Sequence, residues 1–315
     1  AGMKRSRGVA LFVALVVVAL ATVLASRIGA DGARDQRRAA TLALQQQAFQ
    51  IALGAEAWAA EILRDDAERN RRDSLDEVWA TPLPPLPVEG GTVTGRLEDL
   101  QGRFNLNNLV KPDGTRNPVA YAQFVRLLAT LQMEPKWASL VVDWIDPDTV
   151  ADGVDGAEDG VYTGQDPPYR AANRAITSIS ELLALPGFGV ERYRRLQPFV
   201  TALPAGTTLN VCTAPGAVLD SLADNFTVFG QDPKQLAANR ERGCFPYVSD
   251  VEAGLQSVLS ADELQALRAT LGEQSNWFRA TTRVGIGTTQ LTLYSLLQRN
   301  PGGYTRTVLR SFGTE

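Results

Sequence analysis

An acidic stretch in the middle of the chain has the residue types that bind a hard metal cation. Between Trp137 and Tyr169 the sequence has no lysine or arginine but eight acidic residues: Asp143, Asp146, Asp148, Asp152, Asp155, Glu158, Asp159 and Asp166. Glycines in the same stretch argue against a continuous helix and let the backbone turn its carbonyl oxygens inward. Carboxylates and carbonyls without a nearby histidine or cysteine are typical of a calcium site, and not of a zinc or copper site.

The spacing of these acidic residues does not fit an EF-hand. With Asp146 and Asp148 in the first and third positions, the sixth position is Ala151 instead of glycine and the twelfth is Ala157. Magnesium fits less well than calcium, because it needs a small octahedral shell and usually binds substrate phosphates.

Two other interpretations of the acidic stretch stay open. A run of charges is commonly a solvated loop, although the large residues Trp144, Ile145 and Tyr162 within it indicate packing against a core. Paired carboxylates also serve as acid and base in glycosidases, but such sites need a substrate cleft and one raised pKa. The sequence cannot display either property, so we favour metal binding over catalysis.

The composition excludes histidine-dependent catalysis. None of the 315 residues is histidine, which also removes the commonest metal ligand and proton shuttle. The sequence has no G-x-S-x-G or Walker A motif, and Gly285 and Gly287 lie in a strand pattern that opens no helix. We therefore do not expect an enzyme. With 44% hydrophobic and 21% charged residues, the chain can bury a large core in two or three domains.

Residues 9–26 are eighteen consecutive residues without a charge. At a rise of about 1.5 Å per residue, a helix of this length extends roughly 27 Å, which is close to the thickness of a hydrocarbon core. Lys4, Arg5 and Arg7 precede it and predict that the amino end stays in the cytoplasm while the rest of the chain lies outside. A cleaved secretory signal is the alternative, but its apolar region is usually about 7 to 15 residues long.

The residues around Gly8 resemble the prepilin peptidase site of type IV pilins and of type II secretion pseudopilins. A short basic leader ends in Gly8, directly before the apolar run. The resemblance implies cleavage on the cytoplasmic side of the membrane, with Val9 as the new first residue, and methylation of the mature chain. Most pilins have a glutamate at the fifth mature position, where this chain has Val13. Within these families, the absence of that glutamate is characteristic of the K-type minor pseudopilins.

A long helix followed by strands is predicted for the next part of the chain. Residues 33–70 are rich in helix formers. An apolar stripe on this helix is interrupted by Glu56 and needs a cover, for which a sheet is the natural candidate; the stripe consists of Leu42, Phe49, Leu53, Ala60 and Leu63. Four prolines in residues 81–87 predict an extended linker. Strand patterns follow at 92–97, 103–106, 278–286, 291–293 and 303–313.

Residues between about 107 and 276 have a helical pattern and divide into two modules. In the first module, apolar spacing predicts helices at 117–132 and 135–145, and residues 178–200 favour a helix, a tight turn and a second helix. In the second module, Ser260 and Glu263 form a capping box at the start of a helix. The strands on both sides predict that these modules are inserted into a helix-on-sheet unit.

The turn "LPGFG" at residues 185–189 also resembles a helix-hairpin-helix, which presents backbone N–H groups to a nucleic acid phosphate. The segment "LNVCTAP" is similar to the start of such a repeat in DNA-uptake proteins. Phosphate binding needs a basic surface, and Arg192, Arg194 and Arg195 supply only one small cluster beside the acidic stretch. A membrane protein for DNA binding or uptake is therefore the alternative function, but we expect no nucleic acid partner.

Several segments together resemble the K-type minor pseudopilins over nearly the whole chain. They are the leader, "GRFNLNNL", "DWIDPD", "DGAEDGVY", "PPYRAAN" and "LNVCTAP". The resemblance implies an α+β fold in which a long pilin-like N-terminal helix packs on a small antiparallel sheet. A large all-α domain of two SAM-like or helix-hairpin-like modules is inserted into this unit.

The expected division of the chain has six segments. They are the leader (1–8), the transmembrane part of the helix (9–26), the pilin helix with the first strands (27–106), the first helical module with the calcium loop (107–204), the second helical module (205–272) and the C-terminal pilin strands (273–315).

The resemblance also implies a location, a role and partners. It implies a single-pass protein of the bacterial inner membrane, with a periplasmic C-terminal domain, which moves to the pseudopilus tip on assembly. There it would start the pseudopilus, control its length and support protein export. Its partners would be the minor pseudopilins I and J, and also H, the prepilin peptidase and the inner membrane.

In the same family, calcium is held by the inserted helical domain, so we expect one or two Ca²⁺ ions in this chain. The expected ligands are Asp146, Asp148, Asp155, Glu158 and Asp159, with Asp143 and the carbonyl of Tyr162 as further candidates.

Cys212 and Cys244 are the two cysteines of the chain. We expect them to form a disulfide, because they lie in the part predicted to be outside the cytoplasm. A bridge that closes a loop of about 33 residues would stabilise the fold by roughly 3 kcal/mol in the chain-entropy model. Two buried thiols are the alternative.

Overall fold

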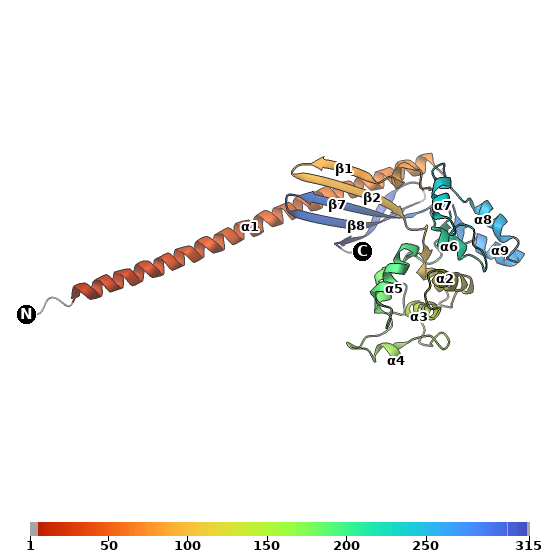
Figure 1. Ribbon diagram of the computed structural model, residues 1–315, viewed down its shortest axis with the longest axis horizontal. Coiled ribbons are helices and arrows are strands. Elements are labelled where there is room, and N and C mark those ends of the chain that lie inside the picture. Colours follow the sequence, from red (N-terminus) through yellow and green to blue (C-terminus); the bar gives the residue numbers. More distant parts are fainter. Residues whose placement is uncertain (1–5, 301, 314–315) are drawn as a thin grey trace, which may run out of the picture.

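The amino-terminal helix gives the molecule its elongated shape. The computed structural model describes residues 6–300 and 302–313. Its first element, α1, extends from Ser6 to Arg69 and is about 96 Å long at 1.5 Å per residue. Figure 1 shows that the amino-terminal half of α1 projects far from the rest of the chain. The predicted processing site, Gly8 and Val9, lies near the start of this helix, whereas residues 1–5 of the predicted leader lie outside the described residues.

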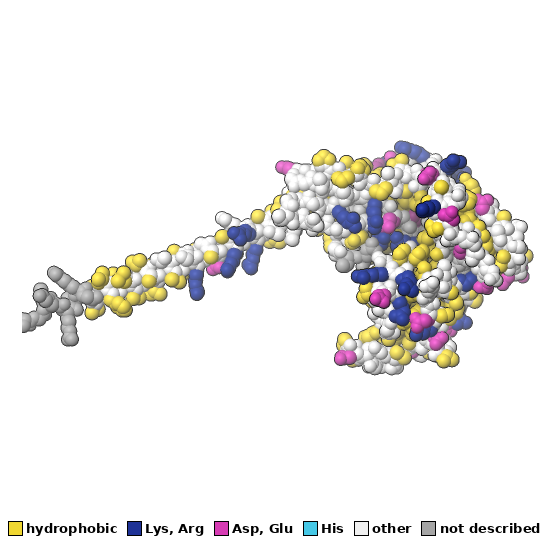
Figure 2. Space-filling model, viewed as in Figure 1, with side chains coloured by type: hydrophobic (Ala, Val, Ile, Leu, Met, Phe, Trp, Pro, Cys, Tyr) yellow, Lys and Arg dark blue, Asp and Glu magenta, His cyan; other side chains and the backbone are white. Residues whose placement is uncertain are grey.

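Within the described residues, α1 is the one helix that is long and apolar enough to cross a membrane. Its apolar window has a mean hydropathy of 2.8, and none of that window is buried against the protein. Figure 2 shows hydrophobic side chains along the projecting helix, followed by basic side chains nearer the body of the protein. An exposed apolar helix of this length needs lipid or other protein around it, which fits the expected single anchor.

Five strands form an antiparallel sheet against the carboxyl-terminal half of α1 (Figure 1). Their order in the sheet is β1-β2-β7-β8-β9. Their bounds are Leu83–Val88 for β1, Gly91–Asp99 for β2, Trp277–Ile286 for β7, Thr289–Arg299 for β8 and Thr305–Phe312 for β9. Because β2 pairs with β7, the two ends of the chain meet in one sheet. This confirms the predicted fold of a long helix on a small sheet that carries an inserted domain.

The proline-rich segment forms an edge strand, so the prediction of a linker there is wrong. Residues 83–88 pair with β2 on one side only, with Leu83 opposite Gly95 and Leu86 opposite Val93. The register shifts between these two pairs, where Pro84 lies. A proline has no N–H to donate, but an edge strand needs donors on one side only, so prolines are tolerated there.

The face of α1 that packs on the sheet differs in part from the predicted stripe. Ala48, Ala52 and Leu63 are completely buried, and the predicted Phe49, Leu53 and Ala60 are half-buried. Leu42, by contrast, is 60% exposed. The turn between β7 and β8 reaches only as far as Leu44, so Leu42 lies beyond the end of the sheet.

Glu56 lies inside this helix–sheet contact and does not interrupt it. Its carboxylate accepts hydrogen bonds from Ser295 (2.5 Å), from Thr307 (2.8 Å) and from both Nε and Nη2 of Arg310 (2.9 and 2.7 Å). Burial alone would raise the pKa of Glu56, but these donors outweigh it and the pKa is lowered. Because all three donors come from β8 and β9, Glu56 fixes the position of α1 along the sheet.

The inserted domain consists of short helices joined by long loops. One short 3₁₀-helix, η1 (Val78–Ala80), lies before the sheet and is not part of this domain. The helices of the inserted domain are η2 (Leu106–Leu109), α2 (Pro118–Thr130), α3 (Lys136–Ile145), α4 (Asp159–Tyr162), η3 (Ile179–Ala184), α5 (Gly189–Leu196), η4 (Gln197–Phe199), α6 (Gly216–Asp220), α7 (Pro233–Arg240), α8 (Val248–Leu255) and α9 (Ala261–Arg268).

Two pairs of short parallel strands also lie in this region. One pair is β3 (Phe104–Asn105) with β4 (Val200–Thr201), and the other is β5 (Leu209–Asn210) with β6 (Leu271–Gly272). The strand predicted at 103–106 is therefore only two residues long and pairs outside the five-stranded sheet.

Two local features of the inserted domain that the sequence predicted, a capping box and a glycine turn, are confirmed. The predicted capping box of Ser260 and Glu263 begins α9, and the predicted turn is made by Gly187 and Gly189, both at positive φ. The helix before that turn, η3, is a 3₁₀-helix and not an α-helix. One continuous hydrophobic cluster runs from Phe104 to Leu271 and so joins the two predicted modules.

The predicted disulfide between Cys212 and Cys244 is confirmed. The two residues are 32 positions apart in the sequence and are both buried. The bridge ties the segment before α6 to the loop after α7, a part of the chain with few long helices. A closed loop of this size stabilises the folded chain by roughly 3 kcal/mol in the chain-entropy model.

Candidate functional site

Three of the predicted ligands converge at the end of α3. Asp146 directly follows that helix, Asp148 lies two residues later, and Glu158 precedes α4. Each contributes one carboxylate oxygen to a group in which all three oxygens lie within 4.8 Å of one another. We call these three residues the insert cluster. Asp146 is buried and Glu158 half-buried, while Asp148 is exposed, so the cluster opens to solvent on one side.

Several oxygens at the insert cluster are buried without a hydrogen-bond donor. They are Oδ1 of Asp146, both carboxylate oxygens of Glu158 and Oδ1 of Asn173. Asn173 belongs to this site because its Nδ2 donates to the carbonyl of Asp148 at 2.8 Å. A buried acceptor without a donor costs about 1–3 kcal/mol, and more if it is charged. A cation bound between the three carboxylates would give a partner to the carboxylates of Asp146 and Glu158.

Asp143 holds the loop of the insert cluster in place. Its Oδ1 accepts from the N–H of Asp152 at 2.9 Å, and its Oδ2 accepts from the N–H of Ala157 at 2.6 Å. Gly156 is required beside it, because a Cβ there would lie 2.4 Å from the Asp143 Oδ2. Arg116 in turn donates to both carboxylate oxygens of Asp152 at 2.8 Å. Asp143 therefore bonds the backbone of the loop that carries Glu158.

The other predicted ligands lie outside the insert cluster in this structure. Asp155 is exposed on the loop before Glu158. The carboxylate of Asp159 accepts from the N–H of Ala171 at 3.1 Å and lies 3.7 Å from Arg170. The carbonyl of Tyr162 accepts from the N–H groups of residues 165 and 169 at 3.2 and 3.3 Å.

Asn173 is the residue that sequence reasoning missed. It has a neutral side chain, so a search for acidic residues passes over it. The available signal was its place at the end of "PPYRAAN", a segment that resembles the K-type pseudopilins. Its backbone has a positive φ of 46°, a conformation that asparagine adopts more readily than most residues.

The carboxyl groups of this loop have raised pKa values. Burial is the largest cause, and the negative charges of the neighbouring carboxylates add to it. Together they raise the pKa of Asp143 to about 6 and those of Asp146 and Glu158 to about 7. The protein groups around this loop therefore do not fully compensate its negative charges.

The stability of the folded chain should depend jointly on pH and on calcium. A carboxyl group with a raised pKa holds its proton more tightly in the folded chain than in the unfolded chain. Without a cation, the contribution of Asp143, Asp146 and Glu158 to the free energy of unfolding should therefore fall as the pH rises from about 4 to about 7. Calcium bound at the insert cluster would compete with these protons, so the stabilisation by calcium should grow over the same pH interval. Melting temperatures of the full chain in calcium and in chelator, at about pH 5.5 and 7.5, measure this. An equal effect of calcium at both pH values would contradict the prediction.

Comparisons with known proteins place this geometry in a family. The family described as "Type II secretion system (T2SS), protein K" matches residues 102–205, which include the insert cluster. A type II secretion system protein K of Pseudomonas aeruginosa is 34% identical over 99% of this chain and 94% of its own length. This chain belongs to the type II secretion system protein K family.

Further relatives agree with this membership. A protein K of Aeromonas hydrophila is 31% identical, with 94% of each chain covered. A solved chain of the GspK-GspI-GspJ complex from enterotoxigenic Escherichia coli has a TM-score of 0.77 at 26% identity, and covers 88% of this chain and 100% of its own. The K family and the pilin-like fold make this chain a minor pseudopilin of type II secretion.

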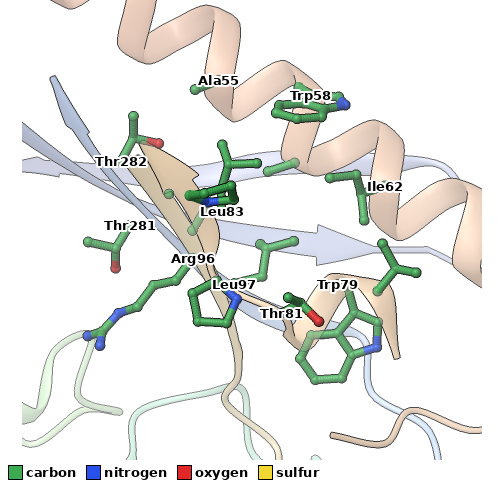
Figure 3. Close-up of a pocket in the computed structure, with 16 residues that line it drawn as sticks. Ala55, Trp58, Ile62, Trp79, Thr81, Leu83, Arg96, Leu97, Thr281 and Thr282 are labelled. Atoms are coloured by element: carbon green, nitrogen blue, oxygen red, sulfur yellow. The ribbon is translucent and has the colours of Figure 1, made fainter. Parts of the chain in front are cut away.

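A second feature of this K-family chain is an apolar groove beside α1. Figure 3 shows Trp58 and Ile62 of α1 on one wall, with Leu83 of β1, Leu97 of β2 and Trp79 of η1 on the other. The groove has a volume of about 210 Å³. The Trp58 side chain is 46% exposed, so the groove between α1 and the sheet offers a large aromatic surface to solvent.

Two arginines of the "LPGFG" hairpin, Arg192 and Arg195, have partners within the protein. Arg192 donates to the carbonyls of Gly187 and Phe188 at 3.2 and 3.1 Å and lies 3.4 Å from Glu134. Arg195 lies within 3.5 Å of the carbonyls of residues 131 and 132. These contacts join the hairpin to residues 131–134 of the inserted domain. The hairpin therefore has a structural role in packing this domain, as expected for an interaction module.

Proposed function

We propose that this chain caps the tip of the type II pseudopilus together with the I and J minor pseudopilins. In this role it starts assembly of the pseudopilus, limits its length and supports protein export. The observation that carries the proposal is the likeness of nearly the whole chain, at a TM-score of 0.77, to a chain of the solved GspK-GspI-GspJ complex.

The position of the inserted domain supports a terminal place in the filament. Figure 1 places this domain at the end of the helix–sheet unit, away from the projecting part of α1. In a pilin-like filament the α1 helices run side by side along the core, so a subunit added above this one would meet the inserted domain. A chain of this shape can therefore sit at the end of a filament but not in its middle.

The amino-terminal part of α1 supports the same place. Pilins with a glutamate at the fifth mature position use it to neutralise the amino terminus of a neighbouring subunit, and this chain has the uncharged Val13 there. Without a subunit above it, a tip protein has no such amino terminus to neutralise. We propose that prepilin peptidase cleaves after Gly8, and that the mature helix is methylated at Val9.

The exposed apolar part of α1 is buried in two environments in turn, first the membrane and then the filament. Before assembly, residues 9–26 lie in the inner membrane and the rest of the chain lies in the periplasm, in line with the basic leader. On assembly the same surface leaves the lipid and packs against the helices of the I, J and H proteins. Both environments bury the apolar surface that the folded chain itself leaves uncovered.

We also propose that the inserted domain binds calcium at the insert cluster. Asp146, Asp148 and Glu158 would provide carboxylate oxygens and Asn173 an amide oxygen, all of them hard ligands of the kind that Ca²⁺ prefers. One ion satisfies this set, and a second would need Asp155 or Asp159 to turn toward it. The ion would lock the loop between α3 and α4 and so stiffen the domain that forms the top of the tip.

Complex formation tests the tip role. The purified full chain in detergent should form a 1:1:1 complex with the I and J proteins, which elutes earlier from a sizing column than any single protein or pair. The tight packing of three pilin-like helices is the physical reason. The major pseudopilin in place of the J protein is the control. Separate elution of the three proteins would contradict the proposed role.

A further inference from the structure

A second group of carboxylates lies outside the inserted domain, where α1 ends. Asp66 is in the last turns of α1, and Asp73 and Glu77 are in the segment that leads from α1 to η1. One oxygen from each of the three lies within 4.8 Å of the other two. We call these residues the joint cluster, because the same segment also contacts the inserted domain. The N–H of Asp73 donates to the carbonyl of Glu273 at 2.8 Å, and Asn210 donates to the carbonyl of Asp73 at 2.9 Å.

An independent observation at the joint cluster indicates a missing ligand. Asp73 is only 1% exposed, and its Oδ1 has no hydrogen-bond donor. Its Oδ2 is already bonded, by Arg299 at 2.5 Å and by the N–H of Ser275 at 2.7 Å. A carboxylate oxygen that is buried without a donor is costly, and no protein group in the described residues supplies one to this atom.

The charges at the joint cluster do not balance within the protein. Among the described residues, Arg299 is the cation that pairs with this cluster, since its guanidinium reaches Asp66 at 3.2 Å and Asp73 at 2.5 Å. Three carboxylates and one guanidinium leave two negative charges if all groups are ionised. Glu77 receives two neutral donors, the N–H of Ser74 at 3.1 Å and the indole N–H of Trp79 at 2.6 Å. Burial raises the pKa of Asp73 to about 7 and also raises that of Glu77.

We propose that the joint cluster is a second divalent cation site, separate from the insert cluster, and that Asp66, Asp73 and Glu77 bind Ca²⁺ there. One divalent cation cancels the two uncompensated charges and supplies the partner that the Asp73 Oδ1 lacks. Irregular loop geometry and carboxylate oxygens favour calcium over magnesium, which demands a regular octahedral shell. A bound ion fastens the end of α1 to the segment that holds the inserted domain, and so stiffens the joint between the two parts of the molecule.

The test begins with a chain whose insert cluster has been disabled. The full chain in detergent with Asp146→Asn and Glu158→Gln should still bind one Ca²⁺, measured by equilibrium dialysis with radioactive calcium at free concentrations up to about 1 mM. On this background Glu77→Gln should weaken the remaining binding about tenfold or more. Glutamine keeps an acceptor oxygen for Ser74 and Trp79, so this variant retains the local hydrogen bonds. Asp76→Asn is the matched control, because Asp76 is an exposed neighbour outside the joint cluster.

A spectroscopic readout locates the ion independently. The Trp79 indole bonds to Glu77, so Tb³⁺ bound at the joint cluster should luminesce when tryptophan is excited, and added Ca²⁺ should suppress this signal. Glu77→Gln should remove the signal, and Asp66→Asn should weaken it, while Asp76→Asn leaves it unchanged. The proposal is overturned if the chain with the disabled insert cluster binds no calcium. It is also overturned if the remaining calcium binding is the same with and without Glu77→Gln.

Discussion

The full chain is expected to unfold at a temperature about 5 to 11 °C higher in saturating calcium than in chelator, and Glu158→Gln is expected to remove at least half of this difference. An ion that binds only the folded chain adds about 2.7 kcal/mol at a hundredfold excess over its Kd. For a domain of about 150 to 250 residues, each 1 kcal/mol shifts the melting temperature by about 2–4 °C. Glu158 is the informative position because neither of its carboxylate oxygens has a donor in the structure.

Two further variants of the acidic stretch accompany this experiment, Asp166→Asn as the control and Asp155→Asn as a test of a further ligand. Asp166→Asn removes one negative charge from an exposed residue outside the insert cluster and should leave the response to calcium unchanged. Asp155→Asn tests whether the ion draws in a residue that is exposed in the structure, and a reduced response would add Asp155 to the ligand set. Any response that survives the combination of Asp146→Asn and Glu158→Gln belongs to the joint cluster. Equal melting temperatures of the unmodified chain in calcium and in chelator would contradict calcium binding altogether.

Replacing Trp58 by aspartate should weaken the complex with the I and J proteins about 30-fold or more. Trp58 is 46% exposed and lines the apolar groove between α1 and the sheet. Tryptophans that fill a desolvated pocket at an interface commonly contribute 2 kcal/mol or more to binding. A charge at this position would have to be buried without a partner, which adds to the loss.

Two controls separate this effect from damage to the fold. Val228→Asp places the same charge on a residue of the inserted domain that is 59% exposed and does not line the groove, and should leave the complex intact. The melting temperature of the Trp58→Asp chain should stay within about 2 °C of the unmodified chain, because Trp58 is not part of the core. Unchanged affinity in a folded Trp58→Asp chain would show that the partners bind elsewhere.

The main elements of the fold could be predicted from the sequence because they depend on local signals. The alternation of apolar and polar residues predicted β7 and β8, and the many helix formers predicted α1. The capping box of Ser260 and Glu263 predicted the start of α9. β1 was missed because the cost of a proline in a strand depends on whether the strand lies at the edge of the sheet. That position is set by the pairing of distant segments, which the prolines themselves do not encode.

The same limit applies to the insert cluster. The residue types predicted a calcium site and named Asp146, Asp148 and Glu158, but acidity alone cannot tell a free carboxylate from one that bonds the backbone. Asp143 bonds two backbone N–H groups, and Asp159 bonds another. Both are hydrogen-bonding roles that a sequence does not display. Glu56 shows the same limit, because its charge was expected to interrupt the apolar stripe, whereas the carboxylate is buried there and paired with Arg310.

Sequencing the amino terminus of the mature protein, purified from cells that contain prepilin peptidase, tests most directly whether α1 is kept as an assembly helix. The expected first residue is Val9, so that residues 9–26 remain on the mature chain. Cells without the peptidase should yield a chain that still carries the basic leader. A mature chain that begins at Arg27 or later would have lost the helix, and neither the anchor nor the packing into a filament would then be possible.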